Sequence, residues 1–92
     1  MNNDELYLQR AVELAASNVA DGGRPFAAVL VKNGQVIVEA VNTIHTSHDP
    51  TAHAEMLAIR GASQQLGTRL DGCVIYASGQ PCPMCLSAMY LC

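Results

Sequence analysis

The feature that most constrains the fold is the dipeptide Asn33-Gly34, which separates two runs of β-forming residues, 26–32 and 35–41. Because a two-residue hairpin turn requires positive φ at both central positions, Asn-Gly between such runs predicts a β-hairpin. The first run is apolar from Phe26 to Val31, the longest unbroken apolar stretch in the chain. A strand of this kind is typical of a sheet that is covered on both faces. We therefore expect 26–32 to be a central strand with helices packed above and below it.

Helical patterns flank the hairpin. Residues 3–19 carry an apolar stripe at helical spacing, formed by Leu8, Ala11, Val12, Ala15 and Val19. The turn residues 21–25 end this helix, and after a polar loop at 42–48 the pair Asp49-Pro50 predicts the N-cap and first position of a second helix, to about Leu66. A third strand is expected over 73–78 and a third helix from Cys82-Pro83 to Cys92. The predicted order is α-β-β-α-β-α, an α/β fold.

Length and composition limit the possible functions. The 92 residues are half apolar and 14% charged, which is typical of one small globular domain. The third strand would have an open edge and the last helix is still running at Cys92, so we expect 1–92 to be the N-terminal part of a longer domain. A net charge of −3 argues against a nucleic-acid partner, and no apolar run is long enough for a membrane span. The acidic, polar N-terminus is unlike a signal peptide, so we expect a cytoplasmic protein that acts on a small molecule.

Two short segments carry candidate chemistry. Cys82 and Cys85 are three residues apart at the expected start of the last helix, where both sulfurs can point the same way and the thiolate form is favoured. His53, at the start of the preceding helix, would be a third ligand. A Cys2His set leaves one position of a tetrahedral zinc open, which is typical of a catalytic site. Glu55 is then the natural general acid and base, provided that the site lies over the end of its helix.

Other interpretations of these residues stay open at this point. The two cysteines of the C-x-x-C pair could be buried structural residues, or a thioredoxin-like redox pair. A closed structural zinc site would need a fourth ligand, but Cys92 lies two helical turns beyond Cys85, and Cys73 begins a strand whose far end leads to the site. His45 and His48 belong to a polar loop, where they are solvated or line the mouth of the site.

The two segments together resemble a known family. His-Ala-Glu at 53–55, followed after 25 residues by Pro-Cys-Pro-Met-Cys at 81–85, resembles the signature of the zinc-dependent cytidine deaminase-like superfamily. The resemblance covers essentially the whole chain and implies a three-layer α/β sandwich. It implies that His53, Cys82 and Cys85 hold Zn2+, and that Glu55 moves protons while a water activated by zinc attacks an amino-bearing carbon and ammonia leaves.

Within the superfamily, segments 49–55 and 81–85 look most like bacterial guanine deaminases, with tRNA adenosine deaminases next. The resemblance implies that Asn42 hydrogen-bonds the base and that Phe26 walls the pocket; from the residues alone, Asn42 could equally satisfy backbone groups at a strand end and Phe26 could be a core residue. The chain departs from the family at Gln80, usually Glu, and from guanine deaminases at Leu91, usually Trp.

The resemblance favours hydrolytic deamination of a nucleobase or nucleoside, with guanine favoured among the substrates. The alternatives are a tRNA adenosine deaminase-like enzyme, or a non-catalytic zinc or thiol-redox domain that uses the C-x-x-C pair. Members of the superfamily commonly assemble through surfaces near the site, so a homodimer or higher homo-oligomer is implied as well.

Overall fold

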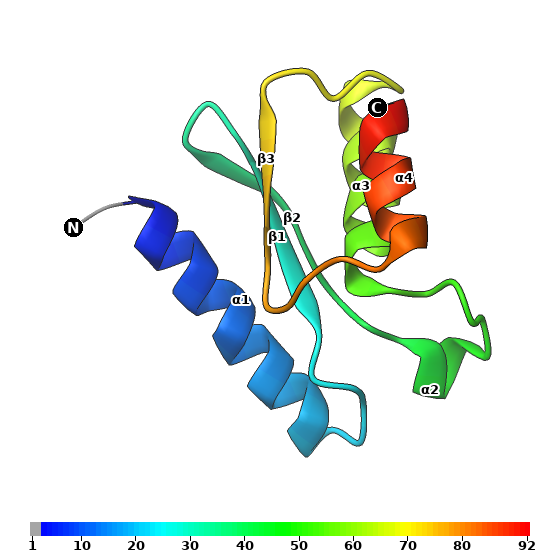
Figure 1. Cartoon of the computed structure of the whole chain (residues 1–92). Coiled ribbons are helices and arrows are strands. Elements are labelled where there is room, and N and C mark those ends of the chain that lie inside the picture. The colour runs from blue at the N-terminus through cyan, green and yellow to red at the C-terminus, as the bar shows by residue number, and fades with distance from the viewer. Residues whose placement is uncertain (1–2) are drawn as a thin grey trace.

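The structure is a computed structural model that describes residues 3–92. In chain order its elements are α1 (Asn3–Ala20), β1 (Ala27–Lys32), β2 (Gln35–Val41), α2 (Ile44–Ser47), α3 (Ala54–Leu66), β3 (Cys73–Ala77) and α4 (Pro83–Leu91). The strands form one antiparallel sheet in the order β2-β1-β3. Figure 1 shows α1 on one face of this sheet, with α3 and α4 on the other. The predicted α/β sandwich of three layers is therefore confirmed.

The hairpin and the central strand are as predicted. Asn33 and Gly34 have φ of 53° and 75°, so both central positions of the turn lie in the left-handed region. Residues 27–31 of β1 are all buried, because β1 pairs with a strand on each side and is covered by helices on both faces. The predicted open edge is also present, since β3 pairs with β1 alone among the described strands.

Small side chains bring α3 close to the sheet. Ala54, Ala58 and Ala62 recur at intervals of four along α3, are fully buried, and form a cluster with Ala28 and Leu30 of β1. At Gly61 an added Cβ would lie 3.1 Å from Cγ2 of Val38 on β2, which is tighter than ordinary contact. The close approach of α3 fixes where its first turn lies relative to the strand ends.

The predicted buried stripe of α1 is partly wrong. Ala11 and Ala15 are buried as expected, but Leu8, Val12 and Val19 are 48%, 53% and 49% exposed. The helix packs through its alanines, with Ala11 against Val29 and Val31, so its backbone lies near β1 and the larger residues turn aside. Asn18, which the apolar pattern did not include, is buried in their place.

The predicted start of the second long helix is also wrong. The Asp49 carboxylate accepts hydrogen bonds from the backbone N–H and the hydroxyl of Thr51, which makes a turn rather than a helix cap. The helix α3 begins at Ala54, with His53 as its N-cap residue. The segment predicted as a polar loop contains one short helical turn, α2, whose C-cap residue, His48, is in the left-handed conformation.

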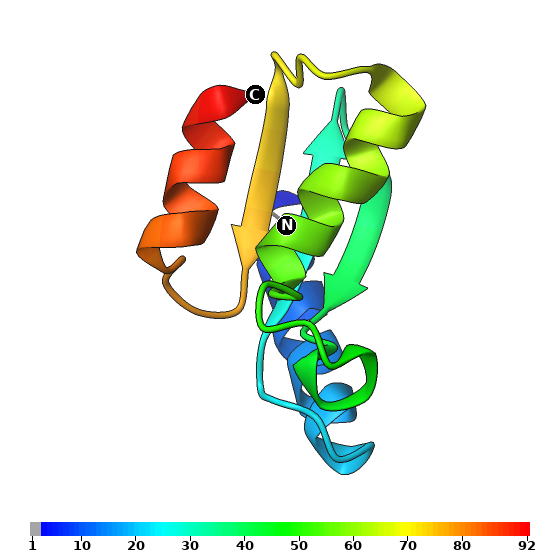
Figure 2. The same ribbon diagram turned by 90° about the vertical axis from the view of Figure 1, so that its right-hand side faces the viewer.

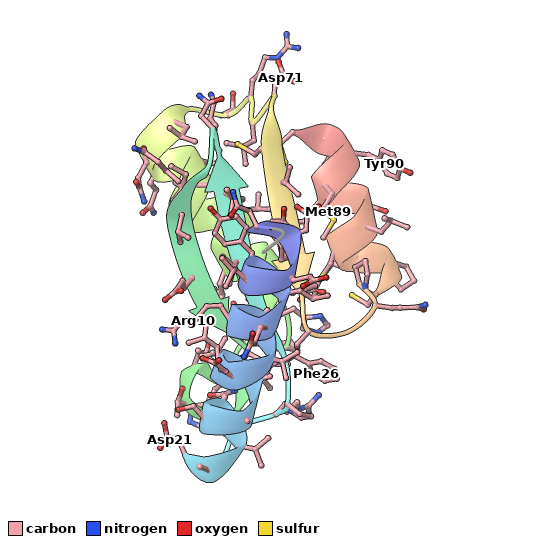
Figure 3. All side chains as sticks on the ribbon, turned by 90° about the vertical axis from the view of Figure 1, so that its left-hand side faces the viewer. Arg10, Asp21, Phe26, Asp71, Met89 and Tyr90 are labelled. Carbon is pink, nitrogen blue, oxygen red and sulfur yellow. The ribbon has the colours of Figure 1, made fainter. Side chains whose placement is uncertain are left out.

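The helices α3 and α4 begin at the same end of the sheet and lie side by side (Figure 2). In α4 only Cys85 is buried, and Tyr90 and Leu91 are 84% and 89% exposed. Figure 3 shows Tyr90 pointing away from the rest of the molecule. Among residues 3–92, no helix combines the length and apolar character that a membrane span requires.

Candidate metal centre

The candidate site lies where β1 begins and its two neighbours end. Ala27 pairs with Val41 at the end of β2, and Ala28 pairs with Ala77 at the end of β3. The connections that leave β2 and β3 at this edge lead to the first turns of α3 and α4. Residues far apart in the sequence are thereby gathered at one end of the sheet.

Two of the candidate ligands are helix N-cap residues. His53 precedes α3 with extended backbone angles, φ −73° and ψ 148°, and its carbonyl accepts the first helical hydrogen bond, from Leu57 N. Cys82 precedes α4 in a similar conformation, followed by Pro83, whose fixed φ suits the first helical position. The Cys82 Sγ accepts a hydrogen bond from Cys85 N at 3.5 Å. Each side chain therefore projects over the end of its helix rather than along its flank.

The three ligand atoms form a compact triangle. The Cys82 Sγ lies 3.3 Å from His53 Nδ1, Cys85 Sγ lies 3.5 Å from the same nitrogen, and the two sulfurs are 3.4 Å apart. Tetrahedral zinc, with bonds of about 2.3 Å to sulfur and 2.0 Å to nitrogen, holds its ligand atoms roughly 3.5 to 3.8 Å apart. The donor set and its spacing therefore fit zinc, with three protein ligands and one position left open.

The two thiols differ in their environment. The hydrogen bond from the Cys85 backbone N–H lowers the pKa of the Cys82 thiol, because it stabilises the thiolate. Burial raises the pKa of the Cys85 thiol to about 12, since the charged form loses its hydration there. Nearby cationic charge reverses such a penalty, so the Cys85 environment suits a thiolate that is bound to a divalent metal.

Glu55 lies within the first turn of α3 and is buried. Two residues on a regular helix point about 200° apart, which would separate Glu55 from His53. His53, however, is outside the helix as its N-cap, so this periodicity does not apply, and both residues line the same pocket. The requirement that the site lie over the helix end is met.

A pocket opens beside the metal ligands. Its walls come from the connections at this end of the sheet and from the first turn of α3. They consist of Arg24, Phe26, Asn42, His53, Glu55, Gln80 and Cys82. The ring of Phe26 packs near Gly79, where an added Cβ would lie 3.4 Å from Phe26 Cε1. Figure 3 shows Phe26 close to the connection between β3 and α4. Phe26 is 44% exposed and lines the pocket, a position that suits the expected role as a wall.

Two pocket residues were not predicted as such from the sequence. Arg24 was placed only among the turn residues 21–25, and Gln80 was noted only as a departure from the family pattern. Both flank a proline that leads directly into the site, Pro25 before β1 and Pro81 before Cys82. Proximity to the motif in sequence was the signal that could have indicated Gln80; Arg24 had none.

Asn42, directly after β2, has its backbone and part of its side chain engaged. Its N–H donates to the Phe26 carbonyl at 3.0 Å, and its Oδ1 accepts from Ile44 N at 3.1 Å. Because Oδ1 is the acceptor in that bond, the remaining polar atom of the side chain is the donor Nδ2. Asn42 therefore satisfies backbone groups, as one interpretation expected, and it also lines the pocket.

The other cysteines and histidines lie outside the ligand cluster. Cys73 and Cys92 pack near Leu30 at the opposite end of β3, which agrees with the prediction that neither reaches the metal ligands. His45 and His48 are exposed and do not line the pocket. Of the described residues, only His53, Cys82 and Cys85 come together as a group of possible metal ligands.

Comparison with known proteins defines the class. Residues 1–92 match the family model of the cytidine and deoxycytidylate deaminase zinc-binding region, so the chain belongs to this family of zinc-binding deaminases. It is 54% identical over 90 residues to guanine deaminase of Bacillus subtilis, covering 96% of this chain and 58% of that protein. It is 45% identical over 92 residues to the tRNA-specific adenosine deaminase of the same organism, covering 99% of this chain and 57% of that protein.

Solved structures agree with these relatives. The crystal structure of B. subtilis guanine deaminase superposes with a TM-score of 0.91, over 98% of this chain and 58% of that one. The structure of NE0047 in complex with 2,6-diaminopurine is 32% identical and gives a TM-score of 0.87, over 96% of this chain and 51% of that one. This chain thus spans a little over half the length of the proteins it matches.

Proposed function

We propose that this chain carries the catalytic residues of a zinc-dependent hydrolytic deaminase that acts on a nucleobase or nucleoside, with guanine favoured. One observation supports this most strongly: the triangle of His53, Cys82 and Cys85 opens onto a pocket that also contains a buried carboxylate and a free amide donor. A redox pair would need only the two sulfurs, whereas here His53 Nδ1 is within 3.5 Å of both.

The proposed chemistry follows from the groups that face the pocket. Zinc held by His53, Cys82 and Cys85 would lower the pKa of a water molecule, and so supply the nucleophile for hydrolysis at neutral pH. Glu55 accepts a proton from the attacking water and returns it to the departing amino group, so the amino compound and water give the oxo compound and ammonia. Asn42 Nδ2 donates a hydrogen bond to an acceptor on the base, and the Phe26 ring covers one side of the base.

The preference for guanine rests on the relatives. The curated protein with 54% identity is a guanine deaminase, and NE0047, with 8-azaguanine and 2,6-diaminopurine in its solved complexes, is about one-third identical. A free base also suits the small pocket and the net charge of −3, since the chain has only five lysines and arginines with which to bind a phosphate backbone.

A second candidate is deamination of adenosine in tRNA. The 45% identity to a tRNA-specific adenosine deaminase extends over 99% of the chain, and a solved tRNA A34 deaminase superposes with a TM-score of 0.87. The same zinc ligands and carboxylate would serve that reaction. The two candidates differ in the surface that must contact the nucleic acid outside the pocket.

The experiment is ammonia release by the zinc-loaded protein from guanine, adenine, cytosine, their nucleosides and a tRNA anticodon stem-loop. We expect release from guanine, and a loss of at least about a hundredfold in kcat in Glu55→Gln, which keeps the size of the side chain but removes the base. Glu13→Gln is the matched control, because Glu13 is an exposed carboxylate on α1. Release from the stem-loop alone would favour the tRNA candidate, and release that survives Glu55→Gln would refute the role of Glu55.

A further inference from the structure

A buried side chain of α1 connects three segments behind the pocket. The amide nitrogen of Asn18 donates both of its hydrogens, to the carbonyl of Arg24 at 2.8 Å and to the carbonyl of Asn42 at 2.9 Å. The Arg24 carbonyl also accepts from Phe26 N at 2.9 Å, and the Phe26 carbonyl accepts from Asn42 N at 3.0 Å. These four bonds form a closed ring through α1, the loop before β1 and the end of β2.

The ring is tightly enclosed. Asn18 is only 6% exposed, although its neighbours in sequence are exposed. A Cβ placed on Gly23 would lie 2.6 Å from Asn18 Nδ2 and 2.6 Å from Cε1 of His45. A side chain at residue 23 would therefore have to displace the Asn18 amide from its two carbonyls. The close packing leaves the amide in one position.

The ring determines the direction in which Asn42 presents its side chain. The backbone N–H of Asn42 is held by Phe26, its backbone carbonyl by Asn18, and its Oδ1 by Ile44 N. The part of the chain that the structure describes offers the fourth group, Nδ2, no partner, and Asn42 lines the pocket. A donor whose other three polar groups are all fixed is preorganised for an acceptor on the ligand.

We propose that Asn18 is a positioning residue of the substrate site: its amide, through the Asn42 and Arg24 carbonyls, aims the Asn42 side chain at a hydrogen-bond acceptor of the bound base. The inference rests on the proposed function for the identity of the ligand, but the positioning itself concerns only this chain. Asn18 does not line the pocket, so it acts through Asn42 and not by contact with the ligand.

The first test needs no activity. In the 15N-labelled, zinc-loaded protein the side-chain NH2 signals of Asn42 are assigned by their loss in Asn42→Asp. We expect these signals to be sharp in the native protein, and to shift and broaden in Asn18→Ala, because the backbone carbonyl of Asn42 has lost its anchor. Signals that stay unchanged in Asn18→Ala would overturn the proposal, whether or not the protein deaminates any base.

The second test uses binding and kinetics. We expect Asn18→Ala to raise KM for the base that is deaminated, or Kd for 8-azaguanine where no base is turned over, by about tenfold, the worth of one hydrogen bond. The kcat and the zinc content should change less than about twofold. In an Asn42→Asp background, which keeps the Oδ1 acceptor but lacks the donor, Asn18→Ala should have no further effect. Fully additive effects would overturn the proposal.

Two further variants separate positioning from general stability. Gly23→Ala, which keeps asparagine at position 18 but displaces its amide, should shift the same Asn42 signals and raise KM or Kd in the same direction. Ala15→Gly is the control, because Ala15 is buried one turn earlier on α1 and its methyl group takes no part in the ring of hydrogen bonds. It should lower the Tm without moving KM, Kd or the Asn42 signals. A rise in KM or Kd in Ala15→Gly equal to that in Asn18→Ala would show a structural role only.

Discussion

The helices α3 and α4 each bring metal ligands to the same end of the sheet, but they are held there in different ways. The apolar buried face of α3 consists of Ala54, Ala58 and Ala62, packed on β1 and β2. In α4 only Cys85 is buried, while Leu86, Tyr90 and Leu91 are exposed. Among the described elements, α3 alone packs beside α4. At the far end of α4, the Leu70 N–H donates a hydrogen bond to the Cys92 carbonyl.

The difference indicates that the two helices depend on the metal to different degrees. Apolar burial holds α3 on the sheet, whereas α4 buries only Cys85, so we expect the position of α4 to depend more on the metal that Cys82 and Cys85 would bind. We therefore expect part of the metal site to be formed without zinc. The packing of α3 would position His53 and Glu55, whereas Cys82 and Cys85 would take up their final positions when they bind the ion. Each prediction below tests this contrast.

The largest effect should come from Cys85→Ser. It replaces a fully buried sulfur ligand, so we expect zinc affinity to fall at least about a hundredfold, as measured by competition with a metal indicator. Cys73→Ser is the matched control, because Cys73 is a partly buried cysteine at the other end of β3 and should leave zinc affinity unchanged. Equal losses in both variants would contradict the assignment.

Removal of zinc should weaken α4 more than α3. At free zinc of about 100 times Kd, binding adds about 2.7 kcal/mol to the stability of whatever structure requires the ion. We expect a chelator to reduce hydrogen-exchange protection in residues 83–91 by up to that amount, and in residues 54–66 by less than about 0.5 kcal/mol. Equal loss in both helices would mean that α3 depends on the metal as well.

A larger side chain on the buried face of α3 should lower the free energy of unfolding, whereas a larger side chain on α4 should change it little. Ala58→Leu adds carbon atoms between α3 and the sheet, where the residue is fully buried, and should cost about 1 to 3 kcal/mol in urea unfolding. Ala88→Leu, on the partly exposed helix α4, should cost less than about 0.5 kcal/mol. A larger cost at residue 88 would show that α4 is packed as tightly as α3.

The smallest effect concerns the far face of the sheet, where Arg10 of α1 donates to the Glu39 carboxylate of β2 at 2.8 Å. This hydrogen bond lowers the pKa of Glu39 in the folded protein, so its contribution to the free energy of unfolding is fully present at pH values above the ordinary carboxyl pKa. It is lost as the pH falls through the folded-state pKa of Glu39. Arg10→Ala should therefore lower the Tm by about 2 °C or less at pH 7, with no difference at pH 2.

Arg69→Ala is the matched control for Arg10→Ala. The pair between Arg69 and Asp71 joins residues two apart in a loop and connects no helix to the sheet. It should leave the Tm unchanged at both pH values. A pH-independent loss in Arg10→Ala would instead indicate that the aliphatic part of Arg10 stabilises α1 through packing.

The sequence predicted those features that depend on local chemistry. The Asn33-Gly34 turn, the buried strand that precedes it and the two motifs each carry their signal within a few residues, and the structure confirms the hairpin and brings the motif residues together. The buried face of α1 could not be predicted in the same way. Alanine and the larger apolar residues both recur at helical spacing, and the choice depends on how closely the helix approaches the sheet.

Two further features were missed, one local and one that depends on tertiary contacts. Asp49-Pro50 has the chemistry of a helix start, but the Asp49 carboxylate accepts a hydrogen bond from Thr51. The helix begins at Ala54, four residues after Pro50, its predicted first position. Asn18 and Arg24 reach the site region only because α1 and the loop before β1 end beside Asn42. No spacing rule connects residues 18 and 42, so only the three-dimensional structure shows the relation.

The N-cap placement of His53 and Cys82 has a consequence for the order of maturation. The two residues are 29 positions apart, and β3 must pair with β1 before the second can reach the first. A chain that grows from its N-terminus therefore completes the hairpin and α3 well before its last ligand exists. Cofactor loading can then follow only after these elements have formed, and in zinc-starved cells the partly exposed Cys82 thiol would be left open to oxidants.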